Sequence, residues 1–142
     1  PGDEAFPLEQ GNEALAKLYS VEFYTGVRNI MTENGALVTQ SSSPFFAPRT
    51  YWTVAETLDA VFDHATSYQI AIPSFGVWGF HIAALEPLEF RALPGNLKSF
   101  DEDVFAASRI FPKDISRPSD LAPNSIFDPN IYRLYALDLK GG

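Results

Sequence analysis

One stretch near the middle of the chain constrains the fold more than any other. Residues 68–80 read Tyr-Gln-Ile-Ala-Ile-Pro-Ser-Phe-Gly-Val-Trp-Gly-Phe. A strand-forming run leads into a Pro-Ser-Phe-Gly turn, and a second apolar run then continues to about Leu85. Two such runs around a turn predict a β-hairpin. Phe75, Trp78 and Phe80 fit either the core of that hairpin or one wall of a pocket, and aromatic side chains are more often core residues.

The length of 142 residues and the apolar content of 46% are enough for one hydrophobic core, so we expect a single domain. No apolar run approaches the roughly 20 residues that span a bilayer, which predicts a soluble piece. The sequence starts at Pro1, without Met or a basic, apolar leader. We interpret it as an excised part of a longer cytoplasmic protein, with no signal peptide in the residues shown.

Composition also excludes several kinds of site. There is no Cys, so disulfides, thiolate nucleophiles and Cys-ligated zinc are excluded. The two histidines, His64 and His81, have no spacing that pairs them with carboxylates, and we predict no metal site. The net charge of −8 argues against nucleic acid as a partner and is compatible with cationic ligands.

The apolar pattern predicts elements in the order helix, strand, helix, strand, strand, over residues 13–34, 36–40, 51–64, 68–72 and 77–85. We expect Asn12 to cap the first helix, Gly35 to end it in a left-handed conformation and Thr50 to cap the second helix. His64 is interpreted as a residue at the end of that helix and His81 as an ordinary strand residue.

The first predicted helix has one apolar face, formed at three- and four-residue spacing by Leu15, Tyr19, Phe23, Val27 and Ile30. Tyr19 belongs to this stripe and is interpreted as structural. Tyr24 lies off the stripe, so we predict that it reaches toward a ligand site.

Strands that alternate with helices predict a mostly parallel sheet covered on both faces, an α/β arrangement. The hairpin makes the last strand antiparallel to the one before it. A three-stranded sheet of this kind leaves one long edge unpaired, which predicts a homo-oligomer or pairing with the remainder of a parent chain.

The character of the sequence changes after Pro87. The pattern Ser99-x-x-Glu102 predicts a capping box and a short helix that continues to about Ile110. A series of prolines then predicts an extended arm, and residues 132–137 form a final apolar segment that we interpret as helical.

Three motifs in this order carry a resemblance to a known family. They are Leu-Tyr-Ser-x-x-Phe-Tyr at residues 18–24, Gly-Ala-Leu-Val-Thr-Gln-Ser-x-Ser-Pro at 35–44 and Ile-Pro-Ser-Phe-Gly-x-Trp-Gly-Phe at 72–80. Together they resemble the C-terminal part of a spermidine synthase-like polyamine aminopropyltransferase, of the bacterial type with a Pro-Ser-Phe-Gly-x-Trp-Gly-Phe hairpin. Phe-Pro-x-Asp at 111–114 and Pro-Asn at 123–124 are similar to the closing segment of that family.

The resemblance implies the C-terminal half of a Rossmann-like, methyltransferase-type sheet plus an extended C-terminal arm. Residues 1–86 would be the last portion of the catalytic domain, and residues 87–142 its C-terminal helix and wrapping arm. The family's Gly-rich loop and its proton-accepting Asp-x-x-Asp-Pro motif would lie upstream. We therefore expect no catalytic residue in this chain and no activity from the chain alone.

The family transfers an aminopropyl group from decarboxylated S-adenosylmethionine, a co-substrate and not a bound cofactor, to a diamine such as putrescine. The resemblance implies that Gln40 accepts a hydrogen bond from the substrate amine. Tyr68 matches the family's substrate-site Tyr. If the alignment with the family shifts by one residue, Gln69 occupies that position instead. Pro73 and Trp78 would form the apolar wall for the methylene chain, although Trp78 is equally suited to packing under the tail.

Two other functions remain open at this point. The parent could be a catalytically silent ligand-binding or assembly module of the same fold, or a small-molecule methyltransferase. Some relatives carry membrane spans before the catalytic domain, which leaves a membrane-associated parent open.

Overall fold

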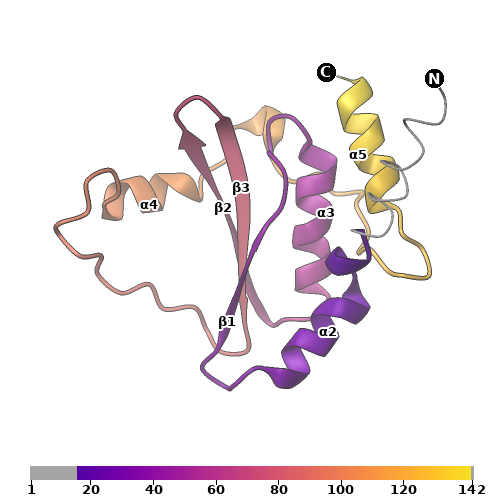
Figure 1. Ribbon diagram of the computed structural model, residues 1–142, viewed down its shortest axis with the longest axis horizontal. Coiled ribbons are helices and arrows are strands. Elements are labelled where there is room, and N and C mark those ends of the chain that lie inside the picture. Colours follow the sequence, from indigo (N-terminus) through magenta and orange to yellow (C-terminus); the bar gives the residue numbers. More distant parts are fainter. Residues whose placement is uncertain (1–15, 142) are drawn as a thin grey trace.

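The computed structural model describes residues 16–141 (Figure 1). Its elements in chain order are η1 (Lys17–Tyr19), α2 (Val21–Ile30), β1 (Ala36–Gln40), α3 (Pro48–Asp59), β2 (His64–Ile72), β3 (Gly76–Ala84), α4 (Glu102–Ser108), η2 (Lys113–Ile115) and α5 (Ile131–Lys140). None of the helices in these residues has the length and apolar character needed to cross a bilayer.

The three strands form one sheet in the order β1-β3-β2. β3 pairs antiparallel with both neighbours, so β1 and β2 run in the same direction without touching each other. The α/β class is confirmed, but the prediction of a mostly parallel sheet is wrong for the described residues. The alternation of strands and helices predicts the direction of β1 and β2, and it does not reveal that β3 inserts between them.

The hairpin between β2 and β3 is confirmed, and its turn consists of residues 73–75 between the paired residues Ile72 and Gly76. The backbone N–H of Phe75 donates to the carbonyl of Ile72 at 3.0 Å. Ser74 and Gly76 have φ angles of 72° and 89°. Glycine tolerates this left-handed region without steric cost, which explains the residue at position 76.

The first helix is shorter than predicted and starts anew at Ser20, whose hydroxyl accepts from the N–H of Phe23 at 3.1 Å. The predicted cap Asn12 lies outside the described residues. Gly35 does not end the helix in a left-handed conformation, because the chain is already extended at Met31. The prediction assumed one unbroken helix from residue 13. Because α2 starts separately at Ser20, a different face of the helix is buried, and Tyr24 faces the core.

The predicted apolar stripe is therefore wrong at two positions, Phe23 and Ile30, which are exposed. The second helix, α3, begins at Pro48, earlier than predicted, and Thr50 does not cap it through its own side chain. Instead the N–H and the hydroxyl of Thr50 both donate to Oδ2 of Asp138 on α5, at 3.0 Å each. His64 begins β2 and does not end a helix.

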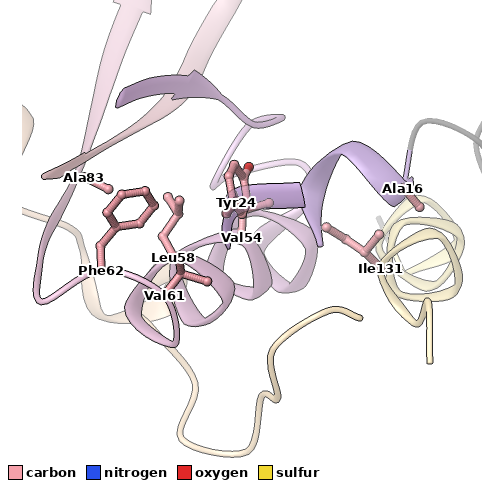
Figure 2. Close-up of a cluster of buried hydrophobic side chains, with 8 residues drawn as sticks. All are labelled: Ala16, Tyr24, Val54, Leu58, Val61, Phe62, Ala83 and Ile131. Carbon is pink, nitrogen blue, oxygen red and sulfur yellow. The ribbon is translucent and has the colours of Figure 1, made fainter. Parts of the chain in front are cut away.

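The core lies between the sheet and the helices α2, α3 and α5, which occupy the same side (Figure 1). Figure 2 shows how side chains of these elements meet in one cluster: Ala16, Tyr24, Val54, Leu58, Val61, Phe62, Ala83 and Ile131. Full burial of a large apolar side chain contributes about 1.5–3 kcal/mol, so the burial of this cluster stabilises the fold.

The opposite side of the sheet carries α4, next to β2 (Figure 1). The helix is confirmed, but Asp101 caps it in place of Ser99, because Oδ1 of Asp101 accepts from the N–H of Val104 at 2.8 Å. The final apolar segment is confirmed as the helix α5, which packs against α3.

The arm between α4 and α5 is fastened to the domain at Asn124, which is fully buried. Its side-chain Nδ2 donates to the carbonyls of Ala16 and Tyr19, at 3.0 Å each. Its backbone N–H donates to Oγ1 of Thr57 at 2.9 Å, and its carbonyl accepts from the N–H of Val21 at 2.9 Å. One residue of the arm thus contacts η1, α2 and α3.

Candidate functional site

Successive side chains of β3 point to opposite faces of the sheet, and the two faces differ in burial. Gly79, His81 and Ala83 are buried on the face covered by α3. Trp78 and Phe80 are only half-buried on the other face, which we call the open face. A ligand can reach side chains on the open face, so the candidate site is sought there.

Three residues form a row across the open face. Gln40 on β1 and Tyr68 on β2 both pair with Phe80 on β3, and directly opposite residues of antiparallel strands share a face. The ring of Tyr68 stacks on that of Phe80 with 5.2 Å between centroids and 14° between planes. Burial raises the pKa of Tyr68. Gln40 and Tyr68 stand on strands about 10 Å apart, because one strand lies between them.

Gln40 is the last residue of β1, as predicted, and its side chain is exposed. It borders a cleft of about 210 Å³, which we call the Gln40 cleft. The cleft is lined by Gln40, Ser42, Ser43, Phe46, Ala47, Trp78, Tyr135 and Leu139. The structure therefore brings together two predicted site residues, Gln40 and Trp78, and adds side chains from α5.

The other predicted residues of the hairpin do not line this cleft. Tyr68 stands further along the row, and Pro73 is exposed in the turn. Gln69 points to the face opposite Tyr68, and its amide donates to the carbonyl of Ile110 at 3.1 Å. Of the two alternatives, only Tyr68 shares a face with Gln40, which favours Tyr68 as the candidate ligand residue.

Tyr24 is a core residue, so the prediction that it reaches a ligand site is wrong. Its side chain is 1% exposed and belongs to the cluster in Figure 2. The hydroxyl is buried without a hydrogen-bond partner among the described residues, and burial raises the pKa of this group. The prediction fails because the helix starts anew at Ser20, which turns Tyr24 inward.

A buried hydrogen-bonded chain on the covered face was not predicted. His81 is 1% exposed, and its Nδ1 lies 2.8 Å from Oγ of Ser67, while its Nε2 lies 2.7 Å from Oγ of Ser41. Burial lowers the pKa of His81 to about 3, so the ring is neutral near pH 7. This chain fixes Ser41, the residue directly after Gln40, to β3 and β2.

Tyr51 of α3 completes the covered face. Its ring lies 4.4 Å from that of His81, and its one O–H is shared between the carbonyls of Tyr68 at 3.0 Å and Phe80 at 3.2 Å. The ring also lies directly over Gly79, where an added Cβ would overlap it. The Gly of the Trp-Gly-Phe motif is thus explained by packing.

One sequence signal could have revealed this chain. In the hairpin, Ser67 stands opposite His81, and both share the inward parity of Gly79 and Ala83. A polar pair at inward positions requires partners, because buried polar groups are hydrogen-bonded. Within residues 16–141, no group of acidic or histidine side chains could hold a metal ion, and no carboxylate lines the Gln40 cleft.

Comparisons with known proteins show which family this chain belongs to. A family model described as the spermine/spermidine synthase domain matches residues 3–91, which is more than half of the chain. The polyamine aminopropyltransferase 1 of Streptomyces coelicolor is 40% identical over 130 residues, which cover 89% of this chain and 24% of that protein. The polyamine aminopropyltransferase of Oceanobacillus iheyensis is 35% identical over 132 residues, 89% of this chain and 26% of that protein.

Solved structures agree on the fold. The spermidine synthase of Thermotoga maritima superposes with a TM-score of 0.54 and 22% identity, over 69% of this chain and 37% of that one. A spermidine synthase in complex with the transition state analogue AdoDATO also gives a TM-score of 0.54 and 22% identity, over 69% of this chain and 38% of that one. This chain spans about a quarter of the length of the curated relatives named above. With the match to the family model, these similarities show that the chain belongs to the spermine/spermidine synthase family.

Proposed function

We propose that this chain is the C-terminal part of a polyamine aminopropyltransferase, and that the whole protein transfers an aminopropyl group from decarboxylated S-adenosylmethionine to a diamine such as putrescine. The observation that carries the proposal is the 40% identity with a polyamine aminopropyltransferase over 89% of the chain. The neighbour with bound AdoDATO, named as a transition state analogue of a spermidine synthase, supports the same reaction class.

The reaction makes one C–N bond and breaks one C–S bond. The lone pair of a neutral primary amine attacks the carbon next to the sulfonium, methylthioadenosine leaves with the C–S electron pair, and a base takes one proton from the amine. The site must therefore bind a cationic amine, orient it in line with the sulfonium and accept a proton.

The Gln40 cleft suits the binding and orientation of the amine. The side-chain carbonyl of Gln40 is exposed at the cleft and can accept a hydrogen bond from an ammonium or amine. The indole of Trp78 offers an apolar wall and an aromatic face that attracts cations. Tyr68 and Pro73 would contact the ligand beyond the cleft, along the open face.

The proton acceptor is expected outside the described residues, because no carboxylate among residues 16–141 lines the cleft. We infer that an Asp of the family's Asp-x-x-Asp-Pro motif supplies it in the parent, and that the chain alone is inactive. Residues 87–142 belong in this proposal to the same domain as residues 1–86, since Asn124 and Asp138 bond to η1, α2 and α3.

The proposal is tested with the intact protein that carries this chain. Incubation with putrescine and decarboxylated S-adenosylmethionine should yield spermidine and methylthioadenosine in equal amounts, whereas the chain alone should yield neither. Turnover by the chain alone would contradict the inference that the proton-accepting base lies outside this chain. Binding of both ligands without turnover would favour a silent binding module, and preference for S-adenosylmethionine itself would favour a methyltransferase.

We also propose that the chain expressed alone self-associates. In the described residues β1 pairs only with β3, which leaves its other edge unpaired, and Val38 on this strand is 56% exposed. In the parent, the same edge would pair with the remainder of the chain. Sedimentation should show dimers or larger species of the chain alone, and a monomer at high concentration would contradict this. A cytoplasmic location is proposed with the function, to be checked by cell fractionation.

A further inference from the structure

The backbone carbonyl of Gln40 points to the edge of β1 that has no strand beside it in residues 16–141. The N–H of Ser41 donates to the carbonyl of Gly79 on β3 at 3.0 Å, so the backbone of Ser41 faces β3. Positions that bond to the partner strand alternate along an antiparallel pair with positions that do not. The carbonyl of Gln40, one residue earlier, is therefore directed away from β3 and needs a partner from outside these strands.

A tyrosine from η1 supplies that partner. The hydroxyl of Tyr19 donates to the backbone carbonyl of Gln40 at 3.3 Å, across 21 positions of the sequence. Oγ1 of Thr39 lies 3.4 Å from the same oxygen, but Thr39 is the neighbouring residue and cannot tie β1 to another element. Tyr19 thus connects the end of β1 to the segment before α2.

Tyr19 is itself held by several contacts. Its ring packs against the core cluster, the structural role that the apolar stripe predicts. Its carbonyl accepts from Nδ2 of Asn124 at 3.0 Å, and the hydroxyl of Ser20, the next residue, donates to the carbonyl of Lys17 at 2.6 Å. A phenol anchored in this way provides a fixed point for the end of β1.

The side chain of Gln40 depends on such support. It is exposed at the Gln40 cleft, and within residues 16–141 its amide makes no hydrogen bond of its own. The segment that follows is tied to β3, because the carbonyl of Ser42 accepts from the N–H of Gly79 at 2.9 Å. The backbone therefore determines where the amide stands, and it is held by β3 on one side and by Tyr19 on the other.

We propose that Tyr19 is a positioning residue for Gln40. Its hydroxyl fixes the backbone at the end of β1, so that the side-chain carbonyl of Gln40 is in place to accept a hydrogen bond from the amine. The inference rests on the proposed function, since it takes Gln40 as the residue that receives the amine. It adds that η1, and through Asn124 the C-terminal arm, contribute to the geometry of the site.

A double-mutant cycle on the intact protein tests this with putrescine and decarboxylated S-adenosylmethionine. Tyr19→Phe keeps the ring and removes the donor, so kcat/KM for putrescine should fall about 2- to 10-fold, the range for one net hydrogen bond. In a Gln40→Ala background the same change should lower kcat/KM no further, because the side chain that Tyr19 positions is gone.

Tyr132→Phe is the matched control for loss of a phenol hydroxyl. The ring of Tyr132 packs against the same core cluster and does not line the Gln40 cleft, and its hydroxyl makes no hydrogen bond in the described part of the chain. Tyr132→Phe should leave kcat/KM unchanged. Thermal unfolding should give nearly the same Tm for Tyr19→Phe and Tyr132→Phe, which separates a local effect at Gln40 from a general loss of stability.

Hydrogen exchange supplies a readout that needs no turnover. The N–H of Ser41 should exchange about 2- to 10-fold faster in Tyr19→Phe and at the wild-type rate in Tyr132→Phe, measured by mass spectrometry of peptides that contain Ser41. Equal losses of kcat/KM with and without the Gln40 side chain, or unchanged exchange at Ser41, would overturn the positioning role. A wild type that transfers no aminopropyl group, while exchange at Ser41 responds to Tyr19→Phe, would refute the proposed function and leave the contact of Tyr19 with β1 standing.

Discussion

The two faces of the sheet differ in burial and in the roles of their side chains, although neighbouring residues of the same strand, β3, form them. On the covered face, His81 is buried, hydrogen-bonded through both ring nitrogens and packed against the ring of Tyr51. On the open face, Phe80 is half-buried and stands between Gln40 and Tyr68, and the ring of Phe105 on α4 contacts Tyr68 at one end of this row. The covered face engages its polar side chains in hydrogen bonds, and the open face leaves the side chain of Gln40 exposed.

This difference separates the positions that hold the fold from those that would hold a substrate. Substitutions at inward positions of β3 should lower the stability of the protein. They should lower activity only because less of the protein is folded. Changes at outward positions should lower binding or turnover and leave stability nearly unchanged, since exposed polar side chains contribute little to folding.

The largest effect is expected at Gly79. Gly79→Ala places a Cβ into the ring of Tyr51, and overpacking of this kind costs about 3 kcal/mol in the free energy of unfolding. Urea denaturation measures this loss. Gly26→Ala is the matched control, because nothing lies within 4 Å of its added Cβ in α2 and alanine should stabilise that helix by about 0.5–1 kcal/mol. Equal stability of the two variants would contradict a packed covered face.

At Gln40 the expected effect is on turnover. Gln40→Ala removes a hydrogen-bond acceptor for a charged amine, which is worth about 1.5–3 kcal/mol, so kcat/KM for putrescine should fall about 10- to 100-fold. Its midpoint of urea unfolding should match that of the wild type. Asn29→Ala, an exposed polar residue of α2, controls for the loss of a surface amide. Unchanged kcat/KM would remove Gln40 from the site.

His81 should make the covered face sensitive to acid. Burial lowers the pKa of His81 to about 3, below its ordinary value of 6.5, so between these values the unfolded chain binds a proton that the folded chain does not. Stability therefore falls as pH decreases through this window, by up to about 1.4 kcal/mol per pH unit.

His81→Gln should reduce that loss by about 1 kcal/mol between pH 7 and pH 5.5, measured by urea denaturation at the two pH values. The variant will also be less stable at pH 7, so the difference between the two pH values is the quantity to compare. His64→Gln controls for loss of a histidine outside the hydrogen-bonded chain. A wild-type pH response in His81→Gln would contradict a buried neutral imidazole.

The smallest effect is expected at Asp138, which ties α5 to the first turn of α3. Asp138→Asn keeps an oxygen acceptor for Thr50 but loses the negative charge at the helix N-terminus, which is worth about 0.3–1 kcal/mol. Thermal unfolding should show a small decrease in Tm. Asp128→Asn, in an exposed ion pair with Arg133, should change Tm less. If Asp138→Asn and Asp128→Asn lower Tm equally, the contact between Asp138 and Thr50 stabilises the protein no more than an exposed ion pair does.

The order and type of the main elements could be predicted from apolar spacing and turn residues, and the hairpin was the most accurate part. The insertion of β3 between β1 and β2 could not be predicted, because strand order depends on contacts far apart in the sequence. The prediction of the buried face of α2 failed for a local reason. The hydroxyl of Ser20 caps a helix that starts there, whereas the predicted helix ran unbroken from residue 13.

For the candidate site, motif resemblance predicted Gln40 and Trp78, and the structure places both in one cleft. The resemblance could not show that Tyr135 and Leu139 of α5 border the same cleft. Both residues follow Trp78 by about 60 residues, and they follow Gln40 by more. The burial of His81 between two serines was likewise missed, since a lone histidine in a strand has no distinctive pattern.

Asn124 has a consequence for the order in which the protein can be completed during synthesis. Ribosomes make a chain from its N-terminus, and domains tend to fold as they emerge. The carbonyls of Ala16 and Tyr19 and the N–H of Val21 bond to a residue more than 100 positions later. These bonds at η1 and at the start of α2 cannot form until the chain up to Asn124 has left the ribosome. A premature stop before Asn124 would leave the beginning of this chain unfinished as well as its end.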